Sequence, residues 1–520
     1  MSSGGAMAGV SVGDRSAGRA ERDGPAPGPV AARSRRVAWA AVRALPGHRT
    51  TSLDAAIATA KPLSFWLDDP GAPKAELPLS SPVRTDLAVV GGGFTGLWTA
   101  LLAKQADPGL DVVLVESHRA GWAATGRNGG FCEASLTHGE ANGRARFPDS
   151  FDELQRLGAD NLAAIEQFVK EHRVDCGWER TGQLTVATEP WQLAELRGEG
   201  GPPPGWLDRD ALCAEVASPT YLGGVWDREG CAMVNPARLA WGIRKSCLEA
   251  GVRIFEHTPV AGMSRSRTGG GRGRNGLLGR GVELRTPGGR VDADRVALAT
   301  NAFDPLLWQV RLRIVPVYDH VLVTEPLTDE QLAPIGWRHR QGLADAGNRF
   351  HYYRLTEDNR ILWGGWDAVY HFGRKVKPAY DQRFATFRTL ARHFSHTFPH
   401  LADVGFTHRW GGAIDTCGRF CAFFGTASKG RVAYAAGYTG LGVGASRFGA
   451  QVMLDLLSGR HTERTGLDLV RTKPTPFPPE PLAWLVVQAT RLSLAHADRH
   501  GGRRNGWLRL LDRLGLGYDS

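Results

Sequence analysis

The sequence predicts a fold of mixed α/β and α+β class, in which a parallel-sheet domain is interleaved with a domain built on an antiparallel sheet. Three observations support this class. A strand, a glycine-rich turn, a helix and a second strand follow one another within residues 85–116. Strands of alternating polarity occupy much of residues 317–365. A further strand, glycine-rich turn and helix come at residues 432–454, which makes the parallel-sheet part discontinuous along the chain.

The first strand, residues 85–90, runs into the turn Gly91-Gly92-Gly93-Phe94-Thr95-Gly96, and a helix continues to about residue 103. Gly91 allows a tight turn, Gly93 lets backbone N–H groups approach a pyrophosphate, and Gly96 lets the helix pack closely on the strand. This pattern predicts a dinucleotide-binding turn. A glycine-rich turn in another kind of α/β protein is the alternative interpretation.

Glu116 ends the second strand, residues 112–116, twenty residues after Gly96. A carboxylate there accepts hydrogen bonds from both ribose hydroxyls and repels a 2′-phosphate, so NADP is disfavoured. The turn does not by itself separate NAD from FAD. A second loop of small residues, 121–130, follows directly and favours a planar ring system that lies against the backbone.

The middle of the chain predicts two helices. Residues 151–170 form an amphipathic helix. A second helix begins at Pro236 after the cap Asn235 and stops at Gly251, and a strand at 252–255 follows it. Residues 269–274 predict a basic surface hairpin.

The C-terminal half predicts the antiparallel sheet, with strands at residues 317–324, 350–355 and 361–365. The strand at 432–436 and the helix through 454 return to the parallel-sheet domain. From Pro474 onward we expect a Pro-rich linker and a basic amphipathic helix ending near Gly515.

Taken together, five segments resemble the D-amino-acid oxidase superfamily of FAD-dependent oxidoreductases, in particular its γ-glutamylputrescine oxidase-like branch. The resemblance covers about residues 65–460 and implies an FAD-binding Rossmann-like (two-dinucleotide-binding) domain interleaved with the antiparallel-sheet substrate domain. The segments that carry it are residues 89–96, 124–130, 234–239, 298–302 and 437–442.

The resemblance also implies which residues contact FAD. Glu116 would hold the adenosine ribose, Val260 the adenine side, and Gly440, Leu441 and Gly442 the pyrimidine edge of the flavin. The N-terminus of the helix after Gly442 would then stabilise negative charge on that edge. The other expected contacts are Gly91, Gly93, Phe94, Thr95, Gly96, Thr125, Arg127, Asn128, Gly129, Gly130, Ala299 and Thr300.

We expect residues 61–150, 225–310 and 400–460 to form the FAD domain, and residues 151–224 and 311–399 the substrate domain. Residues 461–520 would be the linker and C-terminal helix, a solvated packing helix rather than a contact for a partner or membrane. Residues 1–60 predict a disordered basic leader, and its Ser34-Arg35-Arg36 makes only a weak export signal. A cytoplasmic location is expected.

The resemblance implies oxidation of a C–N bond in a small amine or amino acid by hydride transfer to flavin N5, with O₂ as the expected acceptor. A quinone or a carrier protein remains an alternative acceptor. Two other functions also stay open: an FAD-dependent dehydrogenase acting on a C–OH group, and an FAD-fold binding protein without redox chemistry.

The predicted antiparallel strands supply the catalytic candidates. Tyr318 and His320 share one strand face and Tyr352 and Arg354 another, and Arg354 would clamp a substrate carboxylate. Core packing is the alternative for His320, for Tyr352 and for the nearby tryptophans, and a surface ion pair is the alternative for Arg354. His320 and Lys429 are candidate cations for the reaction with O₂.

Seven cysteines are too few for a disulfide scaffold. Cys132, Cys417 and Cys421 are the candidates for covalent flavin attachment, but non-covalent FAD is favoured. No metal site is expected, because Cys417 and Cys421 lack a matching His or Cys pair.

The net charge of +10 lies mainly at the ends of the 520-residue chain. Residues 1–50 contribute +5 and residues 461–520 contribute +3, which leaves +2 for residues 51–460. A basic groove through the body is therefore not indicated, and nucleic-acid binding is not expected. The sequence contains no run of about 18 apolar residues, so an integral membrane segment is not expected.

Overall fold

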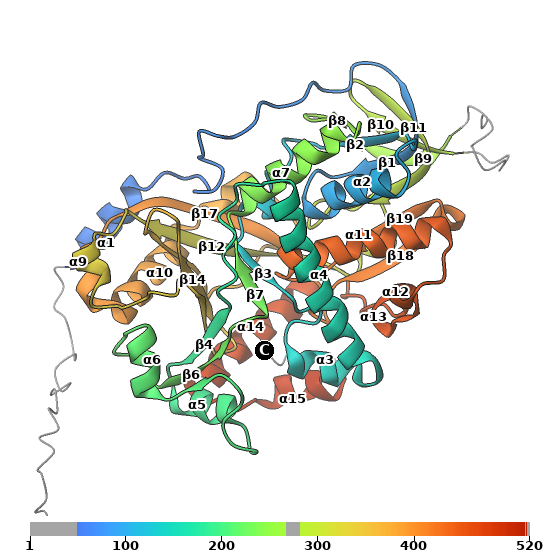
Figure 1. The fold of residues 1–520 in the computed structure, drawn as a ribbon. Helices are drawn as coiled ribbons and strands as arrows, with labels where there is room; N and C mark the ends of the chain where they lie inside the picture. The colour runs from blue at the N-terminus through green and yellow to red at the C-terminus, as the bar shows by residue number, and fades with distance from the viewer. Residues whose placement is uncertain (1–48, 267–280, 515, 517–520) are drawn as a thin grey trace, which may run out of the picture. The chain divides into compact units, whose positions relative to one another are not determined.

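A computed structural model of the protein describes residues 49–266, 281–514 and 516 (Figure 1). Two large sheets organise this part of the chain, one of eight strands and one of nine, and β3 (Phe131–Glu133) and β7 (Cys231–Met233) form a small third sheet. The predicted hairpin at 269–274 and residues 1–48 of the predicted leader lie outside the described residues.

The eight-stranded sheet has a parallel centre. Its main path runs β18-β19-β11-β1-β2-β8, and β9 and β10 extend it as an antiparallel meander on β11. Val90, Val115 and Leu298 lie side by side at the carboxyl ends of their strands, which is where ligands bind in such sheets. The strands are β1 (Val83–Val90), β2 (Val112–Val115), β8 (Arg253–Phe255), β9 (Gly262–Arg265), β10 (Val282–Thr286), β11 (Gly289–Leu298), β18 (Phe423–Ala427) and β19 (Val432–Ala436).

Helices cover one face of this sheet, because alternate residues of β1 face two different cores. Leu87 and Val89 face a core shared with helices, and Ala88 and Val90 face a core shared with the meander. Asn235 caps α7 by accepting a hydrogen bond from the Arg238 N–H at 3.1 Å, as its position before Pro236 predicts. The long helices of this core are α2 (Phe94–Ala106), α4 (Phe151–Glu171), α7 (Pro236–Glu249) and α11 (Gly442–Ser458).

The nine-stranded sheet is antiparallel except where β13 pairs in parallel with β4. A separate core packs against this sheet. It is aromatic and includes Tyr353, Trp363 and Phe394, so Trp363 is a packing residue. Its strands are β4 (Gln183–Ala187), β5 (Trp206–Leu207), β6 (Gly223–Asp227), β12 (Val315–Thr324), β13 (Gly342–Asp345), β14 (His351–Leu355), β15 (Ile361–Gly365), β16 (Val369–Tyr370) and β17 (Phe406–Thr416).

The predicted domain limits are wrong for two elements. Helix α4, assigned to the substrate domain, buries Leu154, Leu162 and Ile165 in the same core as α2 and α11. Strand β17, assigned to the FAD domain, pairs with β12 along its whole length. Both errors have the same reason, because the order of elements in the sequence does not tell which core a helix or strand joins. The other domain limits remain a prediction.

Both predicted terminal segments also need correction. The leader was expected to reach residue 60, but α1 (Arg49–Thr59) is helical and Ile57 and Ala60 are buried in the aromatic core. The single C-terminal helix is two helices, α14 (Leu482–Arg499) and α15 (Gly506–Arg513), which Gly501 and Gly502 separate with φ of 66° and 75°.

The remaining elements are short apart from α10, which has 14 residues. They are η1 (Ala124–Gly126), α3 (Glu140–Arg146), η2 (Pro148–Ser150), α5 (Pro190–Arg197), α6 (Arg209–Glu215), α8 (Trp308–Arg311), α9 (Asp329–Leu332), η3 (Pro378–Asp381), α10 (Phe384–Thr397), η4 (Pro399–Leu401), η5 (Ser428–Gly430), α12 (Glu463–Gly466) and α13 (Asp468–Arg471). None of the helices in the described parts of the chain combines the length and apolar character that crossing a bilayer requires.

Candidate active site

The turn between β1 and α2 depends on glycine at two positions. Gly91 has a φ of 109°, and a Cβ on it would lie 2.4 Å from the Ala299 carbonyl oxygen. A Cβ on Gly96 would lie 1.8 Å from the Gly91 carbonyl oxygen, so helix and turn approach each other only because Gly96 lacks a side chain. Gly93 precedes α2 and has no side chain to cap it; of the first-turn N–H groups, that of Phe94 donates to Thr125 Oγ1 at 3.1 Å, and those that follow it in the turn point to where a ligand can bind.

Glu116 lies beside this turn, at the end of β2. Its Oε2 accepts a hydrogen bond from the Gly92 N–H at 2.6 Å, and its Oε1 accepts one from the His118 N–H at 2.8 Å. The Glu116 carbonyl accepts one from the Thr258 N–H at 2.7 Å, which brings the segment containing Val260 to the same edge of the sheet. The carboxylate predicted to hold the ribose is thus fixed next to the glycine turn.

The second small-residue loop is held rigidly from outside. Asn128 closes it by donating to the Thr125 carbonyl at 2.8 Å and accepting from the Gly130 N–H at 2.8 Å. Three side chains also donate to successive loop carbonyls: Ser64 Oγ to Gly126 at 2.7 Å, Trp410 Nε1 to Arg127 at 2.9 Å, and Trp66 Nε1 to Asn128 at 2.8 Å. A backbone fixed in this way can present a preformed surface to a planar ring.

A cavity of about 540 Å³ lies in front of the turn, the loop and α11. Many of the predicted site residues line it: Gly93, Phe94, Thr95, Thr125, Arg127, Asn128, Gly129, Ala299, Gly440, Leu441, Gly442, Tyr318 and Tyr352. The other predicted site residues are not among its lining residues; they are Gly91, Gly96, Glu116, Gly130, Val260, Thr300, His320 and Arg354.

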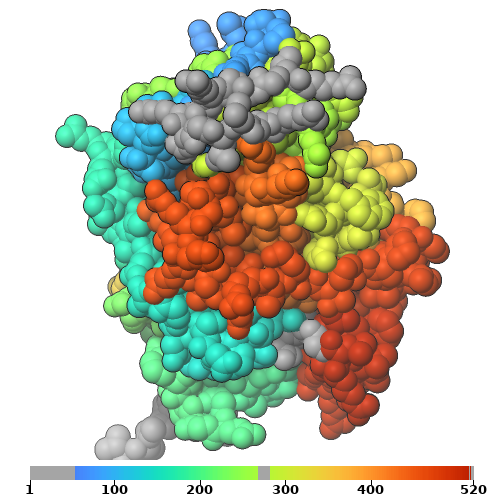
Figure 2. Space-filling view, turned by 90° about the vertical axis from the view of Figure 1, so that its right-hand side faces the viewer, coloured from blue at the N-terminus to red at the C-terminus, as the bar shows by residue number. Residues whose placement is uncertain are grey.

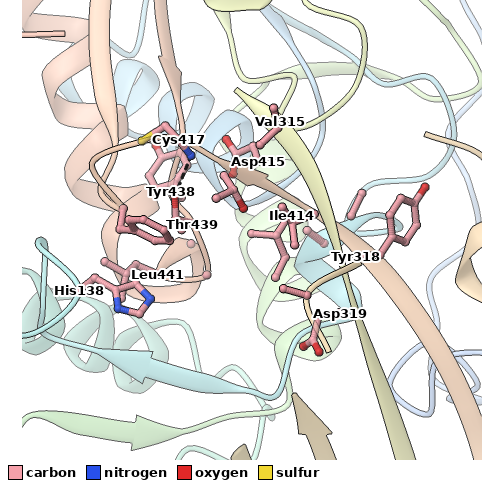
Figure 3. A pocket seen from close by; sticks show the side chains of 18 of the residues that line it. His138, Val315, Tyr318, Asp319, Ile414, Asp415, Cys417, Tyr438, Thr439 and Leu441 are labelled. Carbon is pink, nitrogen blue, oxygen red and sulfur yellow. Dashed lines mark hydrogen bonds between the residues drawn. The ribbon is translucent and has the colours of Figure 1, made fainter. Parts of the chain in front are cut away.

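The start of α11 forms one wall of this cavity (Figure 3). Side chains leave its N-terminus uncapped, and a Cβ on Gly440 or Gly442 would meet open space. Asp415 holds the turn that leads into it, because its Oδ2 accepts a hydrogen bond from the Gly437 N–H at 2.6 Å. Burial raises the pKa of Asp415 to about 7.

These features fit FAD. The N-termini of α2 and α11, whose N-cap residues make no side-chain hydrogen bond, open onto one cavity and favour negative charge there. The residues around Gly93 would hold the pyrophosphate, and the residues from Gly440 to Gly442 would lie along the flavin edge.

Asp319 is the carboxylate that the sequence analysis did not identify. It lies on β12 and lines the cavity, where Figure 3 shows it across from Leu441. Its carboxylate accepts hydrogen bonds from the Tyr352 hydroxyl and, at 2.7 Å, from the His320 N–H. Burial raises the pKa of Asp319 to about 6, while the hydrogen bond from Tyr352 opposes that rise.

Tyr352 connects Asp319 to the small-residue loop. A Cβ on Gly129 would lie 2.6 Å from the Tyr352 ring, so the ring packs directly on the loop backbone. The side-chain pair of Asp319 and Tyr352 therefore stands next to the surface predicted to hold the flavin.

Three predicted roles do not match the geometry. His320 points away from the cavity: its Nε2 lies 3.1 Å from the Tyr380 carbonyl oxygen, its ring packs on Phe387, and burial lowers its pKa to about 4. Tyr318 reaches the cavity rim, but its hydroxyl accepts from the Lys377 N–H at 3.0 Å. Lys429 is exposed and is not among the lining residues.

Arg354 is a structural residue in this geometry. It is buried, and its guanidinium donates to the carbonyls of Gly130 at 3.1 Å and Val234 at 2.9 Å. These bonds, both from Nη1, hold the end of the small-residue loop, and Arg354 is not among the residues that line the cavity. Neither a substrate clamp nor a surface ion pair describes this residue.

Alternation along β12 was the signal that would have identified Asp319. Tyr318 and His320 share the face that packs on η3 and α10, so the residue between them must point the other way. No comparable signal exists for the C-terminal segment, whose side chains also line the cavity.

The parallel sheet, the glycine turn and the cavity between two helix N-termini define a dinucleotide-binding oxidoreductase. A family model described as FAD dependent oxidoreductase matches residues 86–456, and the chain belongs to this family. The predicted D-amino-acid oxidase resemblance, the fold class and FAD as cofactor are confirmed.

Curated relatives and solved structures agree with this assignment. The gamma-glutamylputrescine oxidoreductase of Escherichia coli is 30% identical over 392 residues, covering 73% of this chain and 85% of the relative. The probable oxidoreductase OrdL of Haemophilus influenzae is 26% identical over 410 residues, and the match covers 76% of this chain and 88% of the length of that relative. The glycine oxidase of Geobacillus kaustophilus has the same fold, with a TM-score of 0.58, 20% identity, and coverage of 75% of this chain and 98% of its own.

We predict that FAD is held without a covalent bond. Cys417 lines the cavity, but its Sγ donates to the Cys421 carbonyl at 3.2 Å, and burial raises the pKa of its thiol, which keeps it protonated and weakly nucleophilic. Acid precipitation of the purified protein is expected to leave the yellow colour in the supernatant, and Cys417→Ser to keep its flavin. If the colour stays in the wild-type pellet and is absent from the Cys417→Ser pellet, the prediction is contradicted.

Proposed function

We propose that the protein oxidises a C–N bond of a small amine or amino acid by hydride transfer to flavin N5. The observation that carries this proposal is the carboxylate of Asp319 on the cavity wall, within hydrogen-bonding reach of Tyr352 and so beside the small-residue loop. A carboxylate in a shielded cavity attracts a cation, and an ammonium group matches it in charge and donor geometry. The relative named gamma-glutamylputrescine oxidoreductase supports an amine as substrate.

Asp319 has two tasks in this scheme. It binds the substrate ammonium and then accepts one proton from it, which leaves the neutral amine that can release a hydride from the adjacent carbon. Burial raises the pKa of Asp319 to about 6, closer to that of the ammonium than an exposed carboxylate would be, which makes this proton transfer less unfavourable. Tyr352 positions the carboxylate through its hydroxyl group.

Bound FAD supplies the acceptor for two electrons. The carbon loses a hydride, the nitrogen has already lost one proton, and the product is an iminium ion. Water then adds to its carbon, and the C–N bond breaks to give a carbonyl compound and ammonia or a smaller amine. The protein's part is to place the carbon against the loop at residues 124–130 and to keep bulk water away during the transfer.

We extend the proposal to O₂ as the acceptor that reoxidises the flavin, with hydrogen peroxide as product. A fixed cation near the flavin favours electron transfer to O₂. We choose Arg127 in place of His320 and Lys429, because it belongs to the small-residue loop, lines the cavity and is held 2.5 Å from Asp381.

Anaerobic bleaching of the FAD-loaded protein tests the C–N assignment. Amines or amino acids are expected to remove the yellow absorbance, and readmitted air is expected to restore it with formation of peroxide. Bleaching by polyols alone would overturn the assignment. Recovery only with a quinone would overturn the choice of O₂ and leave the C–N chemistry in place.

A further inference from the structure

One side of α14 forms part of the cavity wall. The family match ends at residue 456, yet α14 contributes lining residues to the cavity; they are Val486, Val487, Thr490, Arg491 and Leu494. Contacts near both ends fasten the helix. Asp498 accepts a hydrogen bond from Arg349 Nε at 3.1 Å, and Glu480, just before α14, accepts one from the Tyr370 hydroxyl group. Helix α14 is therefore a fixed wall rather than the solvated packing helix that its sequence predicts.

The opposite side of α14 is also apolar, but it is exposed. Because successive residues of a helix are rotated by about 100°, Leu485, Leu492 and Arg499 lie in one row, about 180° around the helix from the residues that line the cavity. Leu485 is 52% exposed and Leu492 is 63% exposed. The cavity explains why one side of the helix is apolar, and it leaves this second side unexplained.

Exposed apolar side chains are concentrated in the same part of the chain. Across the described residues, nine large apolar side chains are more than 40% exposed, and five of them lie within residues 482–514; they are Leu482, Leu485, Leu492, Leu510 and Leu514. Figure 2 shows the C-terminal segment, in dark red, on the outer surface at the lower right of the molecule. Single exposed leucines are ordinary on a protein surface, whereas a concentration of them marks a contact surface.

Unpaired positive charge accompanies these leucines. Residues 482–514 contain six arginines and two aspartates. Both aspartates are already paired, Asp498 with Arg349 and Asp512 with Arg504. Four of the arginines are exposed and form no ion pair with any described residue; they are Arg499, Arg503, Arg509 and Arg513. We refer to these four arginines and the five exposed leucines as the C-terminal surface.

The charge of the C-terminal surface determines what kind of partner fits it. Two copies of the chain meeting there would bring the unpaired guanidinium groups of both copies together, and like charges at an interface cost free energy. An anionic phospholipid surface offers phosphate groups to the arginines and an apolar boundary to the leucines, as basic amphipathic helices require. A lipid surface also needs no matching groove, which suits leucines that project from the outside of two helices.

We propose that the C-terminal surface docks the protein on membranes that contain anionic phospholipids. The exposed leucines of α14 and α15 enter the boundary between the headgroups and the acyl chains, and the four unpaired arginines bind the phosphates. The protein binds at the surface of the bilayer and α14 lies between the lipid and the cavity. This docking does not depend on which substrate the flavin oxidises.

Co-sedimentation of the FAD-loaded full-length protein with vesicles tests the proposal. The wild type is expected to sediment with vesicles of equimolar phosphatidylcholine and phosphatidylglycerol and to stay in the supernatant with phosphatidylcholine alone. Binding is expected to weaken steeply as NaCl is raised to about 1 M, where charges are screened beyond about 3 Å.

Two variants with matched controls separate the apolar and the charged contributions. Leu492→Glu is expected to weaken binding to the anionic vesicles by about 10- to 100-fold, the equivalent of the burial of one leucine side chain. Leu77→Glu, at a leucine that is 81% exposed in the connector before β1, is expected to bind like the wild type. Arg513→Gln is expected to weaken binding about fivefold, and Arg265→Gln, at an exposed arginine of β9, to leave it unchanged.

Flavin content and urea unfolding of the four variants are expected to match the wild type, because each substituted side chain is exposed. Absence of binding to the anionic vesicles, equal binding to both kinds of vesicle, or wild-type binding by Leu492→Glu would overturn the proposal. Light scattering without lipid tests the other occupant of this surface. A wild-type dimer that Leu492→Glu converts to a monomer would assign the surface to a second copy of the chain and would also overturn the proposal.

Discussion

Asp319→Asn is expected to lower kcat/KM for the amine substrate by about 10²- to 10⁴-fold, the range that a positioned acid–base group typically contributes. Asparagine keeps the size of the side chain and can still accept the hydrogen bond from the Tyr352 hydroxyl. It carries no charge to attract an ammonium group and cannot take its proton. Steady-state kinetics across pH 5 to 9 measure the effect.

The pH profile distinguishes a direct role of Asp319 from a structural one. Its carboxylate is the active form, so wild-type kcat/KM is expected to fall as the pH drops below the pKa of about 6. Asp319→Asn is expected to lack this acid limb. Tyr352→Phe removes a hydrogen bond that lowers the pKa of Asp319, so its acid limb is expected to move to higher pH.

Asp329→Asn provides the control for loss of one carboxylate, because Asp329 is exposed at the start of α9, outside the cavity lining. It is expected to keep wild-type kinetics. An Asp319→Asn enzyme with an unchanged acid limb would assign that limb to another group and remove Asp319 from the mechanism.

Gly96→Ala is expected to yield protein without bound flavin and to lower the free energy of unfolding by about 3 kcal/mol, the upper part of the range for overpacking. The added Cβ would meet the Gly91 carbonyl oxygen at 1.8 Å, and because that oxygen belongs to the backbone, rotation of a side chain cannot relieve the clash. Helix α2 must then move away from the turn, which displaces the N–H groups predicted to bind the pyrophosphate. Flavin absorbance after purification and urea unfolding measure the two effects.

Gly466→Ala is the matched control, since a Cβ at this position meets nothing within 4 Å. It is expected to bind FAD and to unfold like the wild type. Full flavin content in Gly96→Ala would show that the turn tolerates a side chain and does not approach the cofactor closely.

Local patterns were sufficient to predict the parallel-sheet part. The glycine turn, Glu116 and the helix from Pro236 are each specified by residues close together in sequence, and the strands and helices lie where these residues place them. The physical reason is that a turn with positive φ, a helix cap and an apolar strand depend on neighbouring residues.

The substrate side could not be predicted to the same extent. Tyr318 and His320 are candidates by residue type, since one is aromatic and the other titratable, but the face of β12 that meets the cavity depends on what packs on the other face. That packing comes from η3 and α10, more than 50 residues away in sequence. Arg354 shows the same dependence, since its partners Gly130 and Val234 lie more than 100 residues away.

The sequence by itself predicted a dinucleotide on the glycine turn and a resemblance to FAD-dependent oxidoreductases, and the family is confirmed. Only the tertiary structure decided that Asp319 faces the cavity and that α14 closes one side of it. Backbone conformation is encoded locally, whereas the groups that enclose a cavity come from distant segments that meet through packing.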